Sequence, residues 1–275
     1  MREFYLINGN GIKYSLMDVE HWLYKPKNLG ANFSNKYEQI DSEFVRTRRI
    51  AKPKDPKGKI LFTGKNKYED YYNFIMFLAV EPLTLLYKSN DLYRAKVDLK
   101  EIDKTEIEGG ILECDISFKR CSRWFKEITI LNDEPETGGK VYPYKYIYKY
   151  MEYEAQQATF DSDSGYDSPM KLTIFGPVEN PIWKHYLNNE LIATGKIFAS
   201  VRTGRRIVID GTKIPYSIRE MDNSGKVIRD LYQYSDFDTQ RFFNIKMGRN
   251  RITVEHDGSN SLGLAVEARL EYETV

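Results

Sequence analysis

Histidines are the first residues to test for chemistry, because an imidazole can act as a general base or a metal ligand near neutral pH. The chain has three, His21, His185 and His256, and they are widely spaced. None lies in an H-E-x-x-H or G-x-S-x-G signature. The sequence therefore predicts no catalytic residue, and each histidine is interpreted as a surface or packed side chain. A carboxylate pair for glycoside hydrolysis stays open, since acidic residues are abundant and no pair is singled out.

An aspartate-rich segment, DSDSGYDS, has some likeness to a calcium-binding loop. Such a loop places ligands at positions 1, 3 and 5, glycine at 6 and glutamate at 12. Counting from Asp161, position 5 holds Gly165, position 6 holds Tyr166 and position 12 holds Leu172. The pattern fails at all three, so the segment is predicted to be a solvated turn. We expect no metal ion and no cofactor.

Two arginine clusters could bind an anionic partner. One holds Arg46, Arg48 and Arg49, and the other is RTGRR at residues 202–206. Lys and Arg total 41 against 40 Asp and Glu, so the chain lacks the basic excess typical of nucleic-acid-binding proteins. We expect no nucleic-acid binding, and a solvated face or a protein contact at each cluster. The first three arginines are candidate partner-contact residues.

The composition favours a β-rich interaction protein. The chain has 275 residues, enough for two domains, with 21 Tyr and 14 Phe. Its two cysteines, Cys114 and Cys121, are expected on opposite faces of one extended segment, so no disulfide is predicted. No signal peptide or membrane-spanning run is recognised, which predicts folding in a cytoplasm.

The elements that would position these residues begin with short strands and an exposed Lys- and Pro-rich arm over residues 22–59. One helix is predicted between Asn66, which is expected to cap it, and Pro82, which ends it. Its residues at helical spacing are Tyr68, Tyr71, Tyr72, Ile75, Leu78 and Ala79. Strands follow, and a composition shift near Leu131 predicts domains at 1–131 and 132–275.

The second domain is predicted to be a β-sandwich, because short alternating segments are separated by turn residues. The clearest strand is LGLAVEARLEY, with Leu264, Val266, Ala268, Leu270 and Tyr272 facing inward. FFNIKMGRNRITVEHDG, at 242–258, is predicted to be a β-hairpin. Gly248 would supply its turn, and its surface residues would be Arg249, Arg251 and His256.

Several segments together carry a resemblance to a known family. In the first half they are FYLINGNG, YEDYYNFIMFLAVEPLTLLYK and ILECDISFKRCSRWF, the last including Phe118, Arg120 and the pair Trp124-Phe125. In the second half they are SPMKLTIFGPVENPIW, RRIVIDG and MGRNRITV. In this order the segments resemble the distal tail proteins of siphophages, including prophage-encoded versions. The arm is more Lys- and Pro-rich than is typical of that family.

The resemblance implies a mainly β fold: an N-terminal β-rich domain with one helix and an extended arm, followed by a galectin-like β-sandwich. It also implies a structural role without enzymatic activity. Such proteins form a hexameric ring in the virion tail tip, which joins the tail tube protein to the tail-tip hub protein and can hold receptor-binding proteins. The arm is then a candidate for reaching a neighbouring subunit.

A carbohydrate-binding module that recognises the host cell surface is the alternative function. Its candidate contact residues are Trp183, His185 and Tyr186, which would offer aromatic faces and a polar group. Core packing of Trp183 is the competing interpretation. A hydrolase acting on cell-wall polymer is a third hypothesis.

Overall fold

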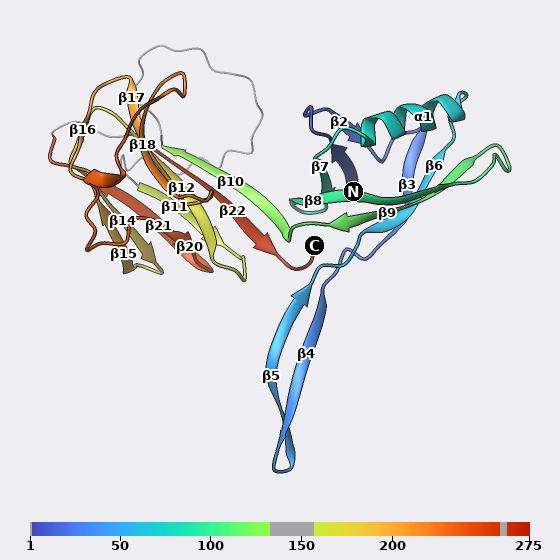
Figure 1. Cartoon of the computed structure of the whole chain (residues 1–275), viewed down its shortest axis with the longest axis horizontal. Helices are drawn as coiled ribbons and strands as arrows, with labels where there is room; N and C mark the ends of the chain where they lie inside the picture. Colours follow the sequence, from blue (N-terminus) through green and yellow to red (C-terminus); the bar gives the residue numbers. More distant parts are fainter. Residues whose placement is uncertain (1, 133–156, 259–262) are drawn as a thin grey trace. The chain divides into compact units, whose positions relative to one another are not determined.

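The computed structural model describes residues 2–132, 157–258 and 263–275. The chain divides into two compact units (Figure 1). The first comprises Met1–Lys126 together with Tyr272–Val275, and the second comprises Glu127–Glu271. The predicted domain boundary at residue 131 falls in strand β10 (Trp124–Asn132), close to this division.

The first unit is a curled antiparallel sheet with one helix. Its neighbouring strands follow the order β2-β1-β7-β8-β9-β6-β3. A bridge between Met17 and Trp22 joins the chain after β2 back to β3, so the sheet nearly closes on itself. Its elements are β1 (Glu3–Ile7), β2 (Lys13–Ser15), β3 (His21–Lys27), β4 (Asn32–Ile40), β5 (Glu43–Lys52), β6 (Lys57–Phe62), α1 (Lys67–Leu78), β7 (Leu83–Lys88), β8 (Leu92–Lys104) and β9 (Leu112–Arg120).

Helix α1 is found where the sequence predicts it and begins at the predicted cap position, but of the six residues singled out for their helical spacing only Leu78 is fully buried. Phe74 and Leu78 are its buried residues, whereas Tyr68 and Tyr72 are exposed. Asn66 is the N-cap residue, yet its side chain makes no capping hydrogen bond. The buried face is set by contact with core rings such as Phe62, whose centroid lies 6.0 Å from that of Phe74. Helical spacing alone does not show which aromatic face of the helix packs against those rings.

The C-terminal residues complete the first unit around a buried arginine. Arg120 is almost fully buried, and its guanidinium donates to the carbonyl oxygen of Glu273 over 3.4 Å. The Glu273 carboxylate accepts from Arg123 over 2.8 Å. Burial lowers the pKa of Arg120. Arg120, one of the residues carrying the family resemblance, therefore helps to fix the end of the chain in this unit.

The second unit contains two antiparallel sheets and a short two-stranded ribbon. One sheet has the order β19-β18-β17-β12-β22, with β20 paired to the start of β12, and the other has the order β11-β21-β14-β15. The ribbon is β13-β16. The elements are β11 (Gln157–Ser162), β12 (Ser168–Phe175), β13 (Val178–Glu179), β14 (Ile182–Leu187), β15 (Glu190–Lys196), β16 (Ser200–Val201), β17 (Arg205–Asp210), β18 (Ser217–Asp222), β19 (Val227–Asp230), η1 (Tyr232–Tyr234), β20 (Asn244–Ile245), β21 (Gly248–Glu255) and β22 (Leu264–Tyr272).

The mainly β class with a single α-helix among the described residues is confirmed. Strand β22 also matches its prediction: Leu264, Val266, Ala268 and Leu270 are buried, whereas Tyr272 is half-buried. The galectin-like form of the second unit stays a prediction. Both cysteines are free, with Cys114 buried and Cys121 exposed.

The predicted hairpin at 242–258 is wrong. Strand β20 pairs with β12, whereas β21 pairs with β11 and β14 in the other sheet. The turn at Met247 and Gly248 is therefore a corner at which the chain passes from one sheet to the other. Arg249 is exposed, while Arg251 and His256 are half-buried. Local sequence resembles a hairpin here because alternation and a turn glycine are common to hairpins and corners.

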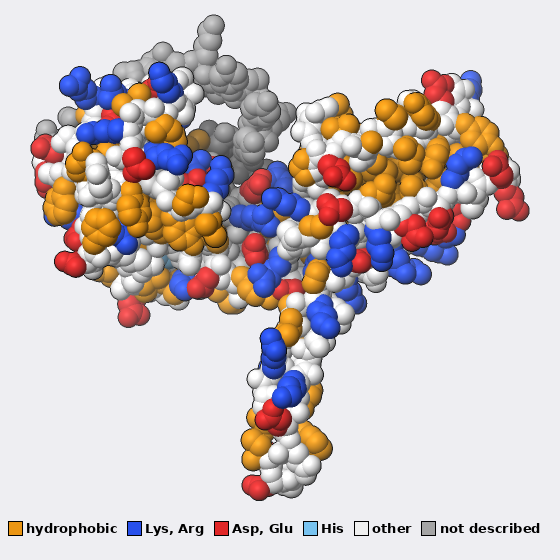
Figure 2. Space-filling view, in the orientation of Figure 1, with side chains coloured by type: hydrophobic (Ala, Val, Ile, Leu, Met, Phe, Trp, Pro, Cys, Tyr) orange, Lys and Arg blue, Asp and Glu red, His pale blue; other side chains and the backbone are white. Residues whose placement is uncertain are grey.

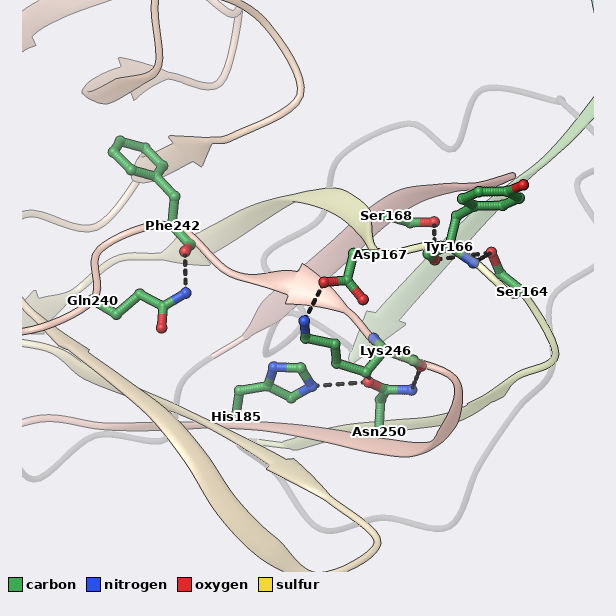
Figure 3. Close-up of polar contacts among 9 residues, drawn as sticks. All are labelled: Ser164, Tyr166, Asp167, Ser168, His185, Gln240, Phe242, Lys246 and Asn250. Atoms are coloured by element: carbon green, nitrogen blue, oxygen red, sulfur yellow. Dashed lines mark hydrogen bonds and ion pairs between the residues drawn. The ribbon is translucent and has the colours of Figure 1, made fainter. Parts of the chain in front are cut away.

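The serine-rich segment that follows β11 is less solvated than predicted. Ser164 and Ser168 are fully buried. The Ser164 hydroxyl lies 3.0 Å from the carbonyl oxygen of Tyr166, to which the Ser168 hydroxyl also donates (Figure 3). The Ser164 hydroxyl also lies 2.8 Å from the carbonyl oxygen of Glu271. These hydroxyl groups form hydrogen bonds with backbone carbonyl groups, so their role is structural.

Candidate interaction surfaces

The predicted arm contains a long two-stranded hairpin formed by β4 and β5. The two strands pair from Asn32 and Lys52 at the base to Ile40 and Glu43 at the tip. Asp41 takes a positive φ of 53° in the turn, a conformation that Asp tolerates. Every β4 side chain is exposed, and in β5 only Ala51 is partly covered.

One face of the hairpin combines aromatic and arginine side chains. Residues opposite each other in an antiparallel pair share a face, and alternate residues along a strand share it too. The pairs Phe33–Ala51, Asn35–Arg49, Tyr37–Arg46 and Gln39–Phe44 therefore lie on one side. The Arg49 guanidinium stacks 3.7 Å from the centroid of the Phe33 ring. We call this side the aromatic–arginine face: Phe33, Tyr37, Phe44, Arg46 and Arg49.

The other face carries Arg48 opposite Lys36, with Ile50 and Val45 on the same side. Figure 2 shows hydrophobic side chains on both sides of the hairpin tip and Lys or Arg side chains nearer its base. Phe44 is 72% exposed and Tyr37 53% exposed. An isolated two-stranded hairpin is marginally stable in water, and exposed aromatic side chains with arginine are typical of interface hot spots. These features make the hairpin a candidate surface for a partner.

The three residues predicted as carbohydrate contacts do not form one platform. Trp183 is fully buried, and its indole Nε1 donates to the carbonyl oxygen of Arg241 over 3.2 Å. Its partner in the neighbouring strand is Gly195, where an added Cβ would overlap the indole ring. Core packing, the competing interpretation, is what the structure shows for Trp183. Tyr186 is half-buried, and the Arg251 guanidinium lies over its ring at 4.3 Å.

His185 belongs to a buried polar cluster at the corner between the two sheets. Its Nε2 lies 2.9 Å from Oδ1 of the fully buried Asn250 (Figure 3). Burial lowers the pKa of His185, and nearby Lys246 acts in the same direction, against the opposing effect of the Asn250 hydrogen bond. Asn250 also accepts from the Lys246 amide and donates to the carbonyl oxygens of Lys246 and Gly248. Asn250 thus holds the corner closed, and His185 is a packed residue.

The second arginine cluster is partly used inside the protein. Arg205 Nη1 and Arg229 Nε lie 2.8 Å and 2.5 Å from the two carboxylate oxygens of Glu220, whose side chain is 2% exposed. Burial raises the pKa of Glu220, but the hydrogen bonds and charges of the two arginines outweigh it and lower the pKa overall. Sequence reasoning missed this triad because its members come from strands β17, β18 and β19.

A cluster of aromatic side chains on the second unit was also missed. The Tyr232 ring contacts Phe237 and Phe242, at centroid distances of 5.9 Å and 6.3 Å. The Arg241 guanidinium lies 4.5 Å from the centroid of the Phe237 ring. Tyr216 contacts Phe242 at 5.0 Å. The available signal was the density of aromatic residues in YQYSDFDTQRFF. We call this set the second-unit aromatic patch: Tyr216, Tyr232, Phe237, Arg241 and Phe242.

No site for covalent or metal chemistry emerges from the described parts of the chain. Over residues 2–132, 157–258 and 263–275, no three His, Cys, Asp or Glu side chains come together as metal ligands. Burial raises the pKa of Cys114 to about 11, which keeps this thiol protonated at neutral pH. His21 lies 2.9 Å from the carbonyl oxygen of Ser15. The three histidines come from separate places in the fold.

Comparison with known proteins agrees with these observations. Residues 3–121 match the family described as distal tail protein, N-terminal domain. The class of protein is therefore a structural component of a phage tail. Residues 3–121 therefore form an N-terminal domain of the distal-tail type.

Solved structures share the fold over nearly the whole chain. One is a chain of the phage P2 baseplate in its activated conformation with Ca, at a TM-score of 0.62 and 16% identity, covering 100% of both chains. The P2 baseplate with Sr gives 0.61 and 16%, again over 100% of both chains. The SPP1 Dit protein gives 0.59 and 9%, covering 97% of this chain and 98% of that one.

No protein with a curated description matches the sequence. Within the described residues, no helix is long and apolar enough to cross a membrane.

Proposed function

We propose that the chain is a ring-forming subunit of the phage tail tip, with a structural and non-enzymatic role. Residues 1–131 would build a homohexameric ring between the tail tube protein and the tail-tip hub protein. Residues 132–275 would form a galectin-like domain that holds receptor-binding proteins. The protein would be synthesised in the host bacterial cytoplasm and would act in the virion, without binding membrane or nucleic acid.

The exposed hairpin carries this proposal. A closed ring needs a heterologous interface, in which one surface of each subunit meets a different surface of the next. A projecting element with an aromatic–arginine face suits one half of such an interface, because Tyr, Phe and Arg contribute strongly to association. The likeness to a baseplate chain and to SPP1 Dit, described as a paradigm of a hub adsorption apparatus, supports the same role.

Light scattering coupled to size-exclusion chromatography tests the proposal. The wild-type chain is expected to elute as a multimer, and the triple variant Phe33→Ser, Tyr37→Ser, Phe44→Ser as a monomer. Ile214→Ser is the matched control, since Ile214 is 91% exposed in the second unit. A wild-type monomer at every concentration would contradict the ring, and a triple variant that still assembles would contradict the hairpin's part in it.

Carbohydrate binding is the second candidate function, and the second-unit aromatic patch is the observation that favours it. Its exposed rings lie near the polar side chains of Asp236, Asp238 and Gln240 in sequence. Calorimetry with host cell-wall glycans would detect such binding, and Phe237→Ala should abolish it. Glycan binding that persists in that variant would exclude the patch.

A further inference from the structure

The first unit carries an acidic surface that complements the hairpin. Strands β8 and β9 send Ile102, Cys114 and Ile116 to the core side. The alternate residues Glu101, Asp103 and Asp115 therefore lie on the opposite, solvent-facing side, and all three are exposed. We call these three residues the carboxylate strip. Figure 2 shows acidic side chains gathered along these strands.

The negative charge of the strip is only partly neutralised within a single copy. Asp103 and Asp115 are directly opposite in the β8–β9 register, an arrangement that destabilises a sheet when both are charged. Lys59 bonds to the neighbouring Glu113 and lies 3.9 Å from Asp115. In the described part of the chain, Glu101 and Asp103 have no ion-pair partner. The strip can therefore accept additional positive charge.

The hairpin, in contrast, carries positive charges that lack negative partners. Arg46 and Arg48 have no carboxylate partner among the residues that the structure describes, and Arg49 is stacked on Phe33. The tip carries Asp41 and Glu43, which would repel a nucleic-acid backbone, so a protein surface is the better partner.

We propose that the aromatic–arginine face of one copy docks on the carboxylate strip of a second copy, where Arg46 and Arg49 meet Glu101 and Asp103. This inference rests on the proposed ring and specifies its contact. The loop between β8 and β9 presents Ile107 and Ile111, 40% and 36% exposed, which can receive the hairpin's aromatic side chains. The hairpin strands have 9 and 10 residues at about 3.3 Å per residue, so they can run along most of β8, which has 13.

Charge reversal in the full chain tests this contact. The hairpin variant Arg46→Glu, Arg49→Glu and the strip variant Glu101→Lys, Asp103→Lys should each weaken self-association about tenfold or more in analytical ultracentrifugation, because like charges then meet. The chain carrying all four substitutions should recover most of the loss, since the charges are exchanged. Controls are Lys213→Glu and Asp238→Lys, at exposed positions of the second unit. Both should assemble as wild type.

The outcomes separate this contact from the ring itself. If the hairpin variant is weakened but the strip variant assembles normally, the hairpin docks elsewhere and only this inference fails. If the fourfold variant shows no recovery, the pairing of these charges is likewise overturned. A wild-type chain that never associates overturns both the contact and the ring. Binding of an oligonucleotide that is lost in the hairpin variant would assign the arginines to nucleic acid and overturn the docking proposal.

Discussion

At the scale of single residues, Glu220 shows how a buried charge is stabilised in the second unit. Its carboxylate accepts from both Arg205 and Arg229. Replacing Glu220 with Gln should lower the free energy of unfolding by about 2 kcal/mol at neutral pH, because charge-assisted hydrogen bonds are lost. Denaturant unfolding of the full chain would measure the loss.

The effect of Glu220→Gln should depend on pH. The folded pKa lies below the ordinary value of 4.5, so the carboxylate stabilises the fold above that pH and loses its effect as pH falls through the folded pKa. The gap between wild type and variant should therefore close in acid. A pH-independent gap would show that the charge of Glu220 is not responsible. Glu190→Gln, at an exposed position of β15, is the matched control.

His185 should make the second unit sensitive to mild acid. Its folded pKa lies below the ordinary value of 6.5, so the fold is fully stable above that pH and loses stability as pH falls toward the folded pKa. His185→Gln should flatten this pH dependence between about pH 7 and 5, where an unperturbed histidine titrates. His256→Gln, a half-buried histidine in the same unit, is the comparison. An unchanged slope in the His185 variant would contradict the assignment.

At the scale of elements, the corner before β21 depends on Gly248. Its φ is +115°, a conformation that side-chain-bearing residues rarely adopt, and an added Cβ would lie 3.0 Å from Asn188 Oδ1. Gly248→Ala should destabilise the second unit by about 1–3 kcal/mol. Gly165→Ala, where an added Cβ meets nothing within 4 Å, should be nearly neutral. Equal thermal midpoints for the two variants would refute this role for the corner.

The elements also show which features of the fold could be predicted from sequence. Strand β22 alternates buried and outward residues because one of its faces packs on a core, and helix α1 is bounded by recognisable end signals. The β4–β5 hairpin has no buried face, so its sequence lacks the alternation that identifies a strand. The corner at Gly248 was predicted to be a hairpin turn. Which sheet each flanking strand joins depends on pairing with strands that are distant in the sequence.

The candidate surfaces, like the fold, could be predicted from the sequence only in part. Arg46 and Arg49 were singled out as a cluster, but their common face depends on a register that a bulge between Lys36 and Tyr37 shifts. Trp183 was singled out for its type, whereas its burial depends on Gly195 in the neighbouring strand. In both cases the missing information was cross-strand pairing, which joins residues that are distant in the sequence.

At the scale of the whole molecule, two compact units suit two tasks. The first unit carries both the aromatic–arginine face and the carboxylate strip, which are different surfaces and so can form a repeating heterologous contact. The second unit carries the aromatic patch, which is the candidate surface for a different partner. Whether such a contact closes into a ring depends on the rotation between successive copies, and only a closed ring fits the proposed position in the tail tip.

Electron microscopy of the purified full-length chain tests this central claim most directly. Class averages are expected to show closed rings with six-fold symmetry, and the triple hairpin variant Phe33→Ser, Tyr37→Ser, Phe44→Ser is expected to show single subunits. Monomeric wild-type particles would contradict the account, and so would open filaments, because a heterologous contact that does not close cannot form the ring.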